Sequence, residues 1–198
     1  DSFMVDMTIM NQGVVEKKQG KYKKAILNLT LSAEGFIRRG DDYQLSEVYT
    51  ALGAIQERLG DNDKAMSFYR QSLEICIERK DLYGMAGGYT NIGGLLRVNG
   101  QLDSALVCLK QAVTLMRSIN GRSLGIMLHN LGLCYINMGK YEQAQETLVE
   151  ALDVNIAMED SNEVVFTAHE LALFYLSHHQ SDMARTYLVT AKEYGALN

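Results

Sequence analysis

Residues 130–152 read NLGLCYINMGKYEQAQETLVEAL. Their apolar side chains recur three and four positions apart on both sides of Gly139, and this spacing predicts two amphipathic helices. Glycine closes a helix at little steric cost because it readily adopts the left-handed conformation. We therefore expect one helix to end at Gly139 and a second to begin just after it, so that the stretch forms a helical hairpin.

The same pattern occurs five times, with a period of 39 or 40 residues. Every copy has a small residue, an alanine twelve positions later and another small residue seven positions after that, with a large apolar residue between the last two. Small residues allow two helix backbones to approach closely, so each copy is predicted to be one tightly packed hairpin. These four columns are Gly13, Gly53, Gly93, Gly132 and Ala172; Ala25, Ala65, Ala105, Ala144 and Ala184; Leu29, Tyr69, Leu109, Leu148 and Leu188; and Ser32, Ser72, Ala112, Ala151 and Ala191.

Two further columns mark the breaks between helices. Within each hairpin the break is predicted at Gly20, Gly60, Gly100 and Gly139, whereas the fifth copy has His179 there. Between hairpins it is predicted at Asp41, Asp81, Asn120 and Asp160, because Asp and Asn favour turns and helix N-caps. We expect one domain over residues 1–198, with repeats at about 1–40, 41–80, 81–119, 120–159 and 160–198. Asp1 lies one period before Asp41, so we also expect the chain to be a piece of a longer protein that starts at a repeat boundary.

The glycine, alanine and leucine columns strongly resemble the tetratricopeptide repeat (TPR), and the resemblance covers essentially the whole chain. The sequence departs from that family in its longer period, since the usual repeat has about 34 residues, and in having no proline. The resemblance implies an all-α fold, a right-handed α-α superhelix (solenoid) of five TPR-like helical hairpins. It also implies that the first helices line a concave surface that binds a protein or peptide.

Composition excludes several classes of partner. The chain has 198 residues and a net charge of -5, distributed as +3 over residues 1–40, 0 over residues 41–140 and -8 over residues 141–198. Nucleic-acid binding generally needs a basic face, so we expect no nucleic-acid partner. The longest apolar runs are a few residues, far short of the ~20 that span a bilayer, so we expect no membrane partner.

The residue types that carry chemistry are sparse. Cys76, Cys108 and Cys134 occupy apolar helical columns, which predicts buried thiols and, with no disulfide spacing, a cytoplasmic location. His129 and His169 fall one repeat apart, which corresponds to about 10 Å and is too far for shared metal ligation. We therefore expect no catalytic residue, no metal site and no cofactor, and predict that the chain is not an enzyme.

The resemblance further implies which residues face the groove. Asn11, Asn91 and Asn130 immediately precede the pair of residues that ends in the first glycine column of their repeats. An amide both donates and accepts, so a row of them can hold an extended peptide backbone. The columns that bind chaperone C-termini in other family members contain no charged clamp here, since they read Met10, Val14, Ala51, Gly87 and Asn91. The groove is expected to become apolar toward its C-terminal end. The predicted peptide-binding residues are Asn11, Thr50, Thr90, Asn91, Arg97, His129, Asn130, Leu133, Asn137, Phe166, His169, Glu170 and Leu173.

Three functional interpretations remain open at this point. The principal one is a protein–protein interaction scaffold that binds an extended peptide or protein segment in its groove. An alternative is a sensor segment of a larger bacterial signalling or transcription regulator. A third is a homo-oligomer in which the basic cluster Lys17, Lys18, Lys21, Lys23 and Lys24 meets the acidic C-terminal part of another copy.

Overall fold

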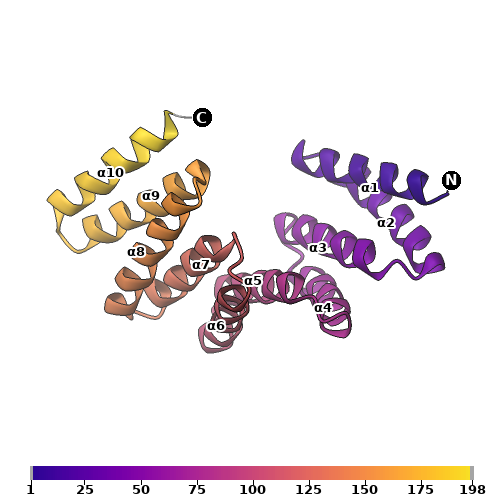
Figure 1. Ribbon diagram of the computed structural model, residues 1–198, viewed down its shortest axis with the longest axis horizontal. Helices are drawn as coiled ribbons and strands as arrows, with labels where there is room; N and C mark the ends of the chain where they lie inside the picture. The colour runs from indigo at the N-terminus through magenta and orange to yellow at the C-terminus, as the bar shows by residue number, and fades with distance from the viewer. Residues whose placement is uncertain (1, 197–198) are drawn as a thin grey trace. The chain divides into compact units, whose positions relative to one another are not determined.

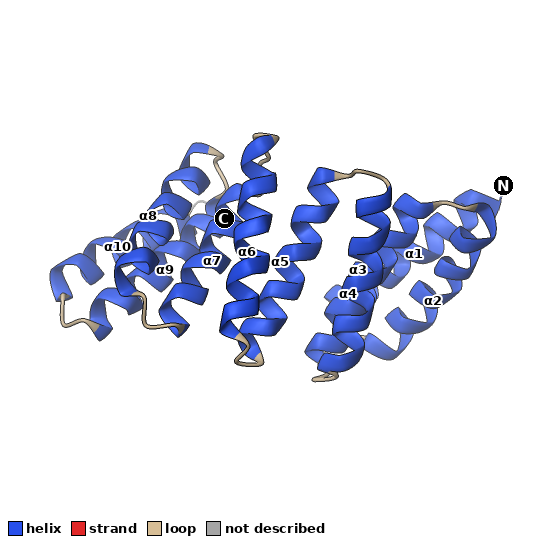
Figure 2. Cartoon of the chain, turned by 90° about the horizontal axis from the view of Figure 1, so that it is seen from below, coloured by secondary structure: helices blue, strands red, loops and turns tan. Residues whose placement is uncertain are grey.

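The structure, a computed structural model, describes residues 2–196. Over these residues it contains ten helices joined by short turns and no strand (Figure 2). The predicted fold class, an all-α solenoid of TPR-like hairpins, is confirmed. The helices are α1 (Ser2–Lys18), α2 (Tyr22–Arg39), α3 (Asp42–Arg58), α4 (Asn62–Glu78), α5 (Leu82–Val98), α6 (Leu102–Ser118), α7 (Leu124–Asn137), α8 (Tyr141–Ala157), α9 (Ser161–Ser177) and α10 (Ser181–Gly195).

The helices fall into two compact units that divide between Leu95 and Leu96, within α5. In unit 1, the described residues up to Leu95, α1 packs on α2, α2 on α3, and α3 on α4 (Figure 1). In unit 2, from Leu96 onward, α6 packs on α7, α7 on α8, α8 on α9, and α9 on α10. The first helices of neighbouring hairpins also touch, α1 with α3 in unit 1 and α7 with α9 in unit 2. Each unit is therefore a stack of hairpins with its first helices on a common side.

The turns lie where the glycine columns predict them. Gly20, Gly60, Gly100 and Gly139 have φ angles of 72°, 79°, 77° and 69°, the left-handed conformation expected at a helix end. The fifth copy makes the same turn without glycine, since His179 has a φ of 58°. The left-handed conformation is therefore a property of the hairpin, and glycine only lowers its cost.

The breaks between hairpins use Asp and Asn in three ways. Asp81 and Asp160 are N-caps: their carboxylates accept the backbone N–H groups of Gly84 and Glu163 at 3.0 and 3.2 Å. Asn120 instead occupies the left-handed turn, with a φ of 47°, and α7 begins only at Leu124. Asp41 makes no cap hydrogen bond.

Asp41 belongs to an ion-pair cluster that joins three helices of unit 1. The Arg39 guanidinium contacts the Asp6 carboxylate of α1 at 2.6 Å and the Asp41 carboxylate at 2.8 Å. The same guanidinium lies over the Phe36 ring, 5.5 Å from its centroid. Asp6 is buried, so Arg39 supplies the counter-charge that its carboxylate needs. The sequence had indicated only a turn at Arg39–Asp41, which Gly40 makes with a φ of 70°.

The small columns explain why the hairpins pack closely. A Cβ added at Gly53 would lie 2.6 Å from the Tyr69 ring, and one added at Gly132 would lie 2.6 Å from Leu148. The first glycine column therefore receives the large apolar column of the same hairpin. The alanine column is buried in all five repeats. Leu188 differs from its four buried counterparts, because 45% of its surface is exposed.

Candidate functional site

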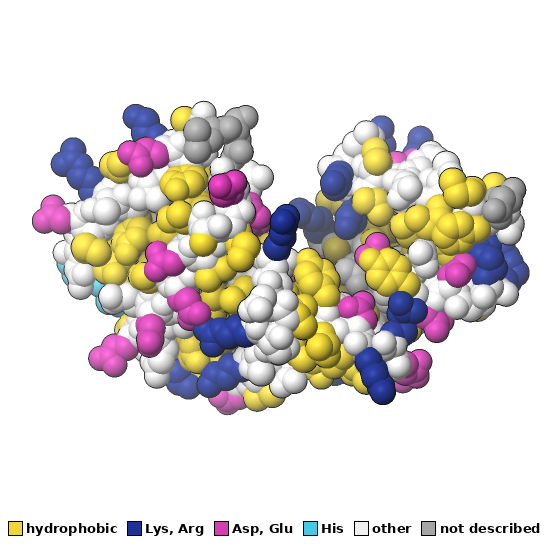
Figure 3. Space-filling view, in the orientation of Figure 1, with side chains coloured by type: hydrophobic (Ala, Val, Ile, Leu, Met, Phe, Trp, Pro, Cys, Tyr) yellow, Lys and Arg dark blue, Asp and Glu magenta, His cyan; other side chains and the backbone are white. Residues whose placement is uncertain are grey.

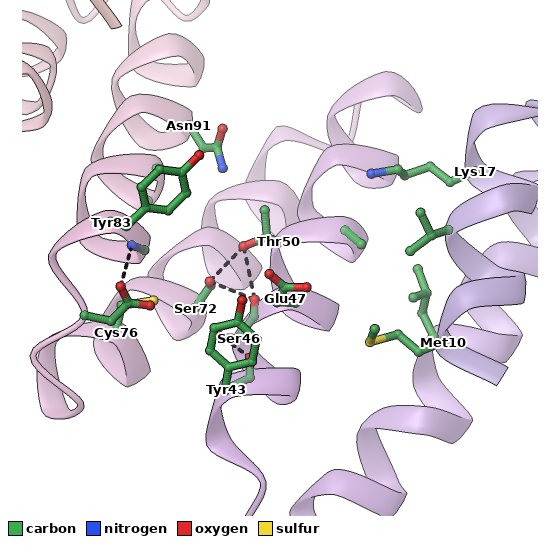
Figure 4. A pocket seen from close by; sticks show the side chains of 17 residues that line it. Met10, Lys17, Tyr43, Ser46, Glu47, Thr50, Ser72, Cys76, Tyr83 and Asn91 are labelled. Atoms are coloured by element: carbon green, nitrogen blue, oxygen red, sulfur yellow. Dashed lines mark hydrogen bonds between the residues drawn. The ribbon is translucent and has the colours of Figure 1, made fainter. Parts of the chain in front are cut away.

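A cavity of about 340 Å³ opens in unit 1 on the side of the first helices (Figure 4). Helices α1, α3 and α5 supply most of its lining, and α4 supplies part of its floor. Residues four apart on one face of α3 and of α5 contribute, as the helical period requires. The lining consists of Met10, Val14, Lys17, Leu29, Tyr43, Ser46, Glu47, Thr50, Ala51, Ser72, Cys76, Asp81, Tyr83, Gly84, Gly87, Gly88 and Asn91.

The floor of the cavity is a set of hydroxyls that are already satisfied. The Ser72 hydroxyl donates to the Ser46 carbonyl at 2.8 Å, and the Thr50 hydroxyl lies 2.8 Å from the Ser72 hydroxyl and 3.1 Å from the same carbonyl. Cys76 lies beside them, and burial raises the pKa of its thiol. These groups stabilise the contact between α3 and α4, and the thiol is held in its protonated form.

The walls combine two tyrosine rings with opposite charges. Tyr43 and Tyr83 occupy equivalent positions in successive repeats and are 45% and 54% exposed. The pKa of Tyr43 is raised mainly by the negative charge of the Glu47 carboxylate and, to a smaller extent, by partial burial. Lys17 extends from α1 toward the middle of the cavity, and its pKa is lowered by burial and, less strongly, by Lys18 and Arg58 (Figure 4). The cavity therefore has an anion on α3 and a partly desolvated cation on α1.

On α5, the cavity is lined by glycines, which have no side chain to fill it. A Cβ at Gly87 would meet no atom within 4 Å, so this residue leaves open space at the cavity surface. Gly88, the next residue, also lines the cavity but approaches α4, since a Cβ there would lie 3.1 Å from the Leu73 side chain. One glycine therefore opens the cavity and the other permits close helix packing.

The structure brings only some of the predicted peptide-binding residues of unit 1 to this cavity. Thr50 and Asn91 line it, whereas Asn11 and Thr90 do not. The Thr90 hydroxyl donates to the Ala86 carbonyl of its own helix at 2.8 Å, and Asn11 is exposed on α1. The Asn91 amide makes no hydrogen bond with the described residues, so its donors and acceptor are available.

The predicted peptide-binding residues leave out the charged and aromatic side chains that line the cavity, Lys17, Tyr43, Glu47, Asp81 and Tyr83. A usable pattern was present. Residues 43, 47 and 51 are four apart on α3, and adding one period gives residues 83, 87 and 91 on α5. The prediction followed the columns next to the first glycine column and did not extend two helical turns toward the N-terminus, where the two tyrosines lie.

In unit 2, His129 lies in a buried polar network between three helices. Its Nδ1 atom is 3.1 Å from the Thr167 hydroxyl of α9, which in turn accepts a hydrogen bond from the Asn155 amide of α8 at 3.2 Å. Because that hydroxyl accepts from Asn155, it can direct its own proton to His129. Burial, and to a smaller extent Arg97, lowers the pKa of His129 to about 4, so the imidazole is neutral at pH 7. His129 therefore serves the packing of α7 against α9.

Arg97 and Asn137, both predicted groove residues, are brought together. The Arg97 Nη1 donates to the Asn137 Oδ1 at 3.3 Å, which joins the end of α5 to the end of α7 within unit 2. The Arg97 Nε is buried and has no acceptor. Among residues 2–196, no carboxylate lies within ion-pair distance of this guanidinium.

The other predicted residues of unit 2 differ in how available they are. The Asn130 amide already donates to the Ile126 carbonyl one helical turn before it, at 2.9 Å, and Leu133 is half-buried. On α9, Glu170 is half-buried, while Phe166, His169 and Leu173 are exposed. Phe166 is 63% exposed, and Leu173 is two helical turns away on the same face. Hydrophobic side chains also reach the surface of unit 2 on the face seen in Figure 3.

Other kinds of site find little support in the described part of the chain. No group of three or more His, Cys, Asp or Glu side chains gathers there in a way that could hold a metal ion. Of the three thiols predicted to be buried, Cys76 and Cys134 are buried and Cys108 is half-buried. Burial raises the pKa of the Cys76 and Cys134 thiols. None of the helices described is long and apolar enough to cross a bilayer.

Comparison with solved structures places the fold among known helical repeat proteins. BtubC (BKLC) from P. vanneervenii superposes with a TM-score of 0.82 at 20% identity, over 99% of this chain and 82% of that one. A Rap protein complexed with Competence and Sporulation Factor gives 0.83 at 19% identity, over 95% of this chain and 53% of that one. The third structure is a signal transduction ATPase of the STAND class with a tetratricopeptide repeat sensor, from Pyrococcus horikoshii. It superposes with a TM-score of 0.78 at 21% identity, over 96% of this chain and 30% of that one.

At such identities these likenesses show the fold alone, and the chain spans only about half of the Rap protein and less than a third of the ATPase. No curated protein matches the sequence. The family model of the tetratricopeptide repeat, however, matches residues 5–78, 84–155 and 123–193, which together cover most of the chain. The chain therefore belongs to the tetratricopeptide repeat family.

Proposed function

We propose that this chain binds a segment of another protein, in extended conformation, in the unit 1 cavity formed by α1, α3 and α5. TPR repeats generally mediate protein–protein interaction, and their stacked helices present surfaces rather than catalytic centres. The observation that carries the proposal is the open cavity of about 340 Å³, lined by the unpaired Asn91 amide and two exposed tyrosine rings. A cavity of this size accommodates a few peptide side chains, since ligand pockets start at about 300 Å³.

Asn91 is the residue best suited to hold a peptide backbone. Its amide presents a donor and an acceptor, which a peptide group can satisfy in turn. Asn130 has the equivalent position one repeat later, but its donor is already bonded to Ile126, and Asn11 lies outside the cavity. We therefore propose backbone capture at Asn91 alone, in place of the asparagine row that the sequence predicts.

Tyr43 and Tyr83 would supply the apolar contact. Tyrosine rings bury a large area at a low cost in side-chain entropy, which makes them common at binding surfaces. The Tyr43 ring already receives a cation, since the Arg79 guanidinium lies 5.5 Å from its centroid. The proposal is binding rather than catalysis, because the cavity's serine hydroxyls bond to backbone and to each other and its thiol is protonated.

Selection from a peptide library tests this function. Random peptides about 12 residues long, which span about 40 Å when extended, are displayed on phage and selected against the chain. The recovered sequences are synthesised with a fluorescein label, and their affinities for wild type and for Asn91→Ala are measured by fluorescence anisotropy. Removing two hydrogen bonds at about 1 kcal/mol each weakens binding by about tenfold or more.

Gln145→Ala is the matched control, because Gln145 is an exposed amide on α8 of unit 2. Its affinity should equal that of wild type, and circular dichroism should show the same helix content for all three proteins. If no peptide is recovered, or if the recovered peptides bind Asn91→Ala as tightly as wild type, the proposed role of the cavity is wrong.

A second candidate is the sensor segment of a larger regulator. The fold similarity to the tetratricopeptide repeat sensor of the STAND protein supports it, although that similarity extends to 30% of that chain. In this case the same cavity would receive the signal, and the output would come from another domain. Ligand-dependent activity of the full-length protein that is lost with Asn91→Ala would favour the sensor role over a simple scaffold.

A further inference from the structure

Arg97 is a half-buried cation of unit 2 that has no carboxylate as an ion-pair partner among the described residues. A guanidinium has five N–H donors, and the described residues give this one a single acceptor, the Asn137 Oδ1 at 3.3 Å. Its Nε is buried without an acceptor. By contrast, Arg39 in unit 1 has two carboxylates, at 2.6 and 2.8 Å. Removing a charge from water costs free energy unless an opposite charge compensates, and no such charge is present at Arg97.

Three of the groups near Arg97 are neutral, while Lys140 and Asp103 are charged groups that act on Cys134 beside it. Asn137 is an uncharged amide, and His129 is neutral at pH 7 because its pKa is lowered to about 4. Cys134 is also close enough to feel the charge of Arg97, and burial keeps its thiol protonated. Asp103 makes no ion pair with Arg97, so an anion that approached the guanidinium would displace no carboxylate.

The site has access to solvent and a second donor. The Arg97–Asn137 hydrogen bond is exposed, so the outer edge of the guanidinium is open to a ligand. Because the Asn137 Oδ1 accepts from Arg97, the amide nitrogen of Asn137 remains able to donate. A planar carboxylate matches a guanidinium edge with two parallel N–H···O bonds, and the Asn137 amide can add a third.

We propose that Arg97 and Asn137 form a carboxylate-binding site that takes the carboxylate of a partner protein segment. Leu133 and Asn130 lie on the same face of α7, one and two turns before Asn137, so a chain held at Arg97 would run along this face. The binding must be local to Arg97, since residues 141–198 carry a net charge of -8 and would not attract an anion generally. The site is distinct from the unit 1 cavity, and its test does not depend on that cavity.

The test uses short blocked peptides and the intact chain. Three probes are compared: acetyl-Ala-Ala-Glu-Ala-Ala-amide, its Gln analogue, and acetyl-penta-alanine with a free C-terminal carboxylate. Binding is followed by NMR through the Arg97 Nε–Hε signal, which burial of Nε should protect from exchange with solvent and which Arg97→Gln identifies by its loss. The Glu peptide should shift this signal, whereas the Gln peptide should not.

The two carboxylate probes separate the sources of the ligand group. Binding of the Glu peptide assigns the site to an acidic side chain, binding of the free acid assigns it to a chain terminus, and either result supports the site. The affinities of the variants are measured by fluorescence anisotropy with fluorescein-labelled forms of the same probes, since Arg97→Gln lacks the Nε–Hε signal. Arg97→Gln should weaken binding at least tenfold, because charge-assisted hydrogen bonds are lost. Arg122→Gln is the matched control, since Arg122 is an exposed arginine of the same unit, and it should bind as wild type does.

Asn137→Ala guards against misfolding of the Arg97 variant, because Asn137 is exposed and its truncation leaves the helix intact. It should weaken binding severalfold while the helix content stays unchanged. The proposal is overturned if the Glu and Gln peptides shift the signal equally, if neither carboxylate probe binds, or if Arg97→Gln and Arg122→Gln lower the affinity by the same factor.

Discussion

Replacing Gly87 by alanine should make the protein more stable, which is unusual for a residue that lines a cavity. A glycine inside a helix costs about 0.8–1.0 kcal/mol relative to alanine, because it loses more backbone freedom on folding. A Cβ at Gly87 meets no atom within 4 Å, so no steric term offsets this gain. We therefore expect the free energy of unfolding to rise by about 0.5–1 kcal/mol.

Gly88→Ala is the internal control for this prediction. It lies in the same helix and carries the same propensity gain, but its Cβ would lie 3.1 Å from the Leu73 side chain of α4. That contact is tighter than ordinary van der Waals distance, so the gain should shrink or reverse as Leu73 is displaced. The two variants differ only in what the added methyl group meets.

Urea denaturation followed by circular dichroism at 222 nm measures both variants, and thermal unfolding provides a second reading, since 1 kcal/mol shifts Tm by about 2–4 °C at this chain length. The expected order of stability is Gly87→Ala, then wild type, with Gly88→Ala at or below wild type. If both variants stabilise equally, the close approach of α4 to Gly88 is wrong. If Gly87→Ala destabilises the protein, the open space at Gly87 is wrong.

Three further predictions concern the packing of each unit. The folded state holds the pKa of His129 at about 4, below its ordinary value of 6.5, so the unfolded state binds more protons between these two pH values. The free energy of unfolding should therefore fall by up to about 3 kcal/mol as pH drops from 6.5 to 4. Urea denaturation at pH 7 and pH 4.5 should show a smaller loss for His129→Asn than for wild type, and an equal loss contradicts the assignment. Gly132→Ala should lower the free energy of unfolding by about 1–3 kcal/mol, because its Cβ would lie 2.6 Å from Leu148, and unchanged denaturation would refute the close contact. Arg39→Met leaves the buried Asp6 carboxylate without its cation and should lower the free energy of unfolding in a urea titration, and the double variant with Asp6→Asn should restore part of the loss. No recovery would show that Arg39 acts mainly through its aromatic contacts.

The repeat made the fold predictable from the sequence. Five copies of the small, alanine and large columns define which helix faces meet, and the structure buries Leu29, Tyr69, Leu109 and Leu148 as that pattern requires. The hairpin turn was predictable at Gly139 for the same reason, since few residues other than glycine adopt a left-handed conformation at low cost. His179 shows that a periodic fold can impose this conformation on another residue.

The candidate site was less predictable, because side-chain hydrogen bonds do not follow the repeat. Asn91 and Asn130 are equivalent in the sequence, yet one amide is unpaired and the other bonds to its own helix. The cluster of Asp6, Arg39 and Asp41 joins residues far apart in the sequence, and no column indicates it. No observation on the structure tests the predicted cytoplasmic location or the predicted homo-oligomer, so both stay predictions.

The central claim is that the unit 1 cavity holds the partner segment, and filling that cavity tests it most directly. Gly87→Leu places an isobutyl group in the open space at the cavity surface, whereas Gly94→Leu makes the same change on the same helix at a glycine that also has open space around it but does not line the cavity. The measurement is the affinity of a library-selected, fluorescein-labelled peptide for both variants and for wild type. The account predicts at least about a tenfold loss, or about 1.4 kcal/mol, for Gly87→Leu and an unchanged affinity for Gly94→Leu. Wild-type affinity in Gly87→Leu would contradict it.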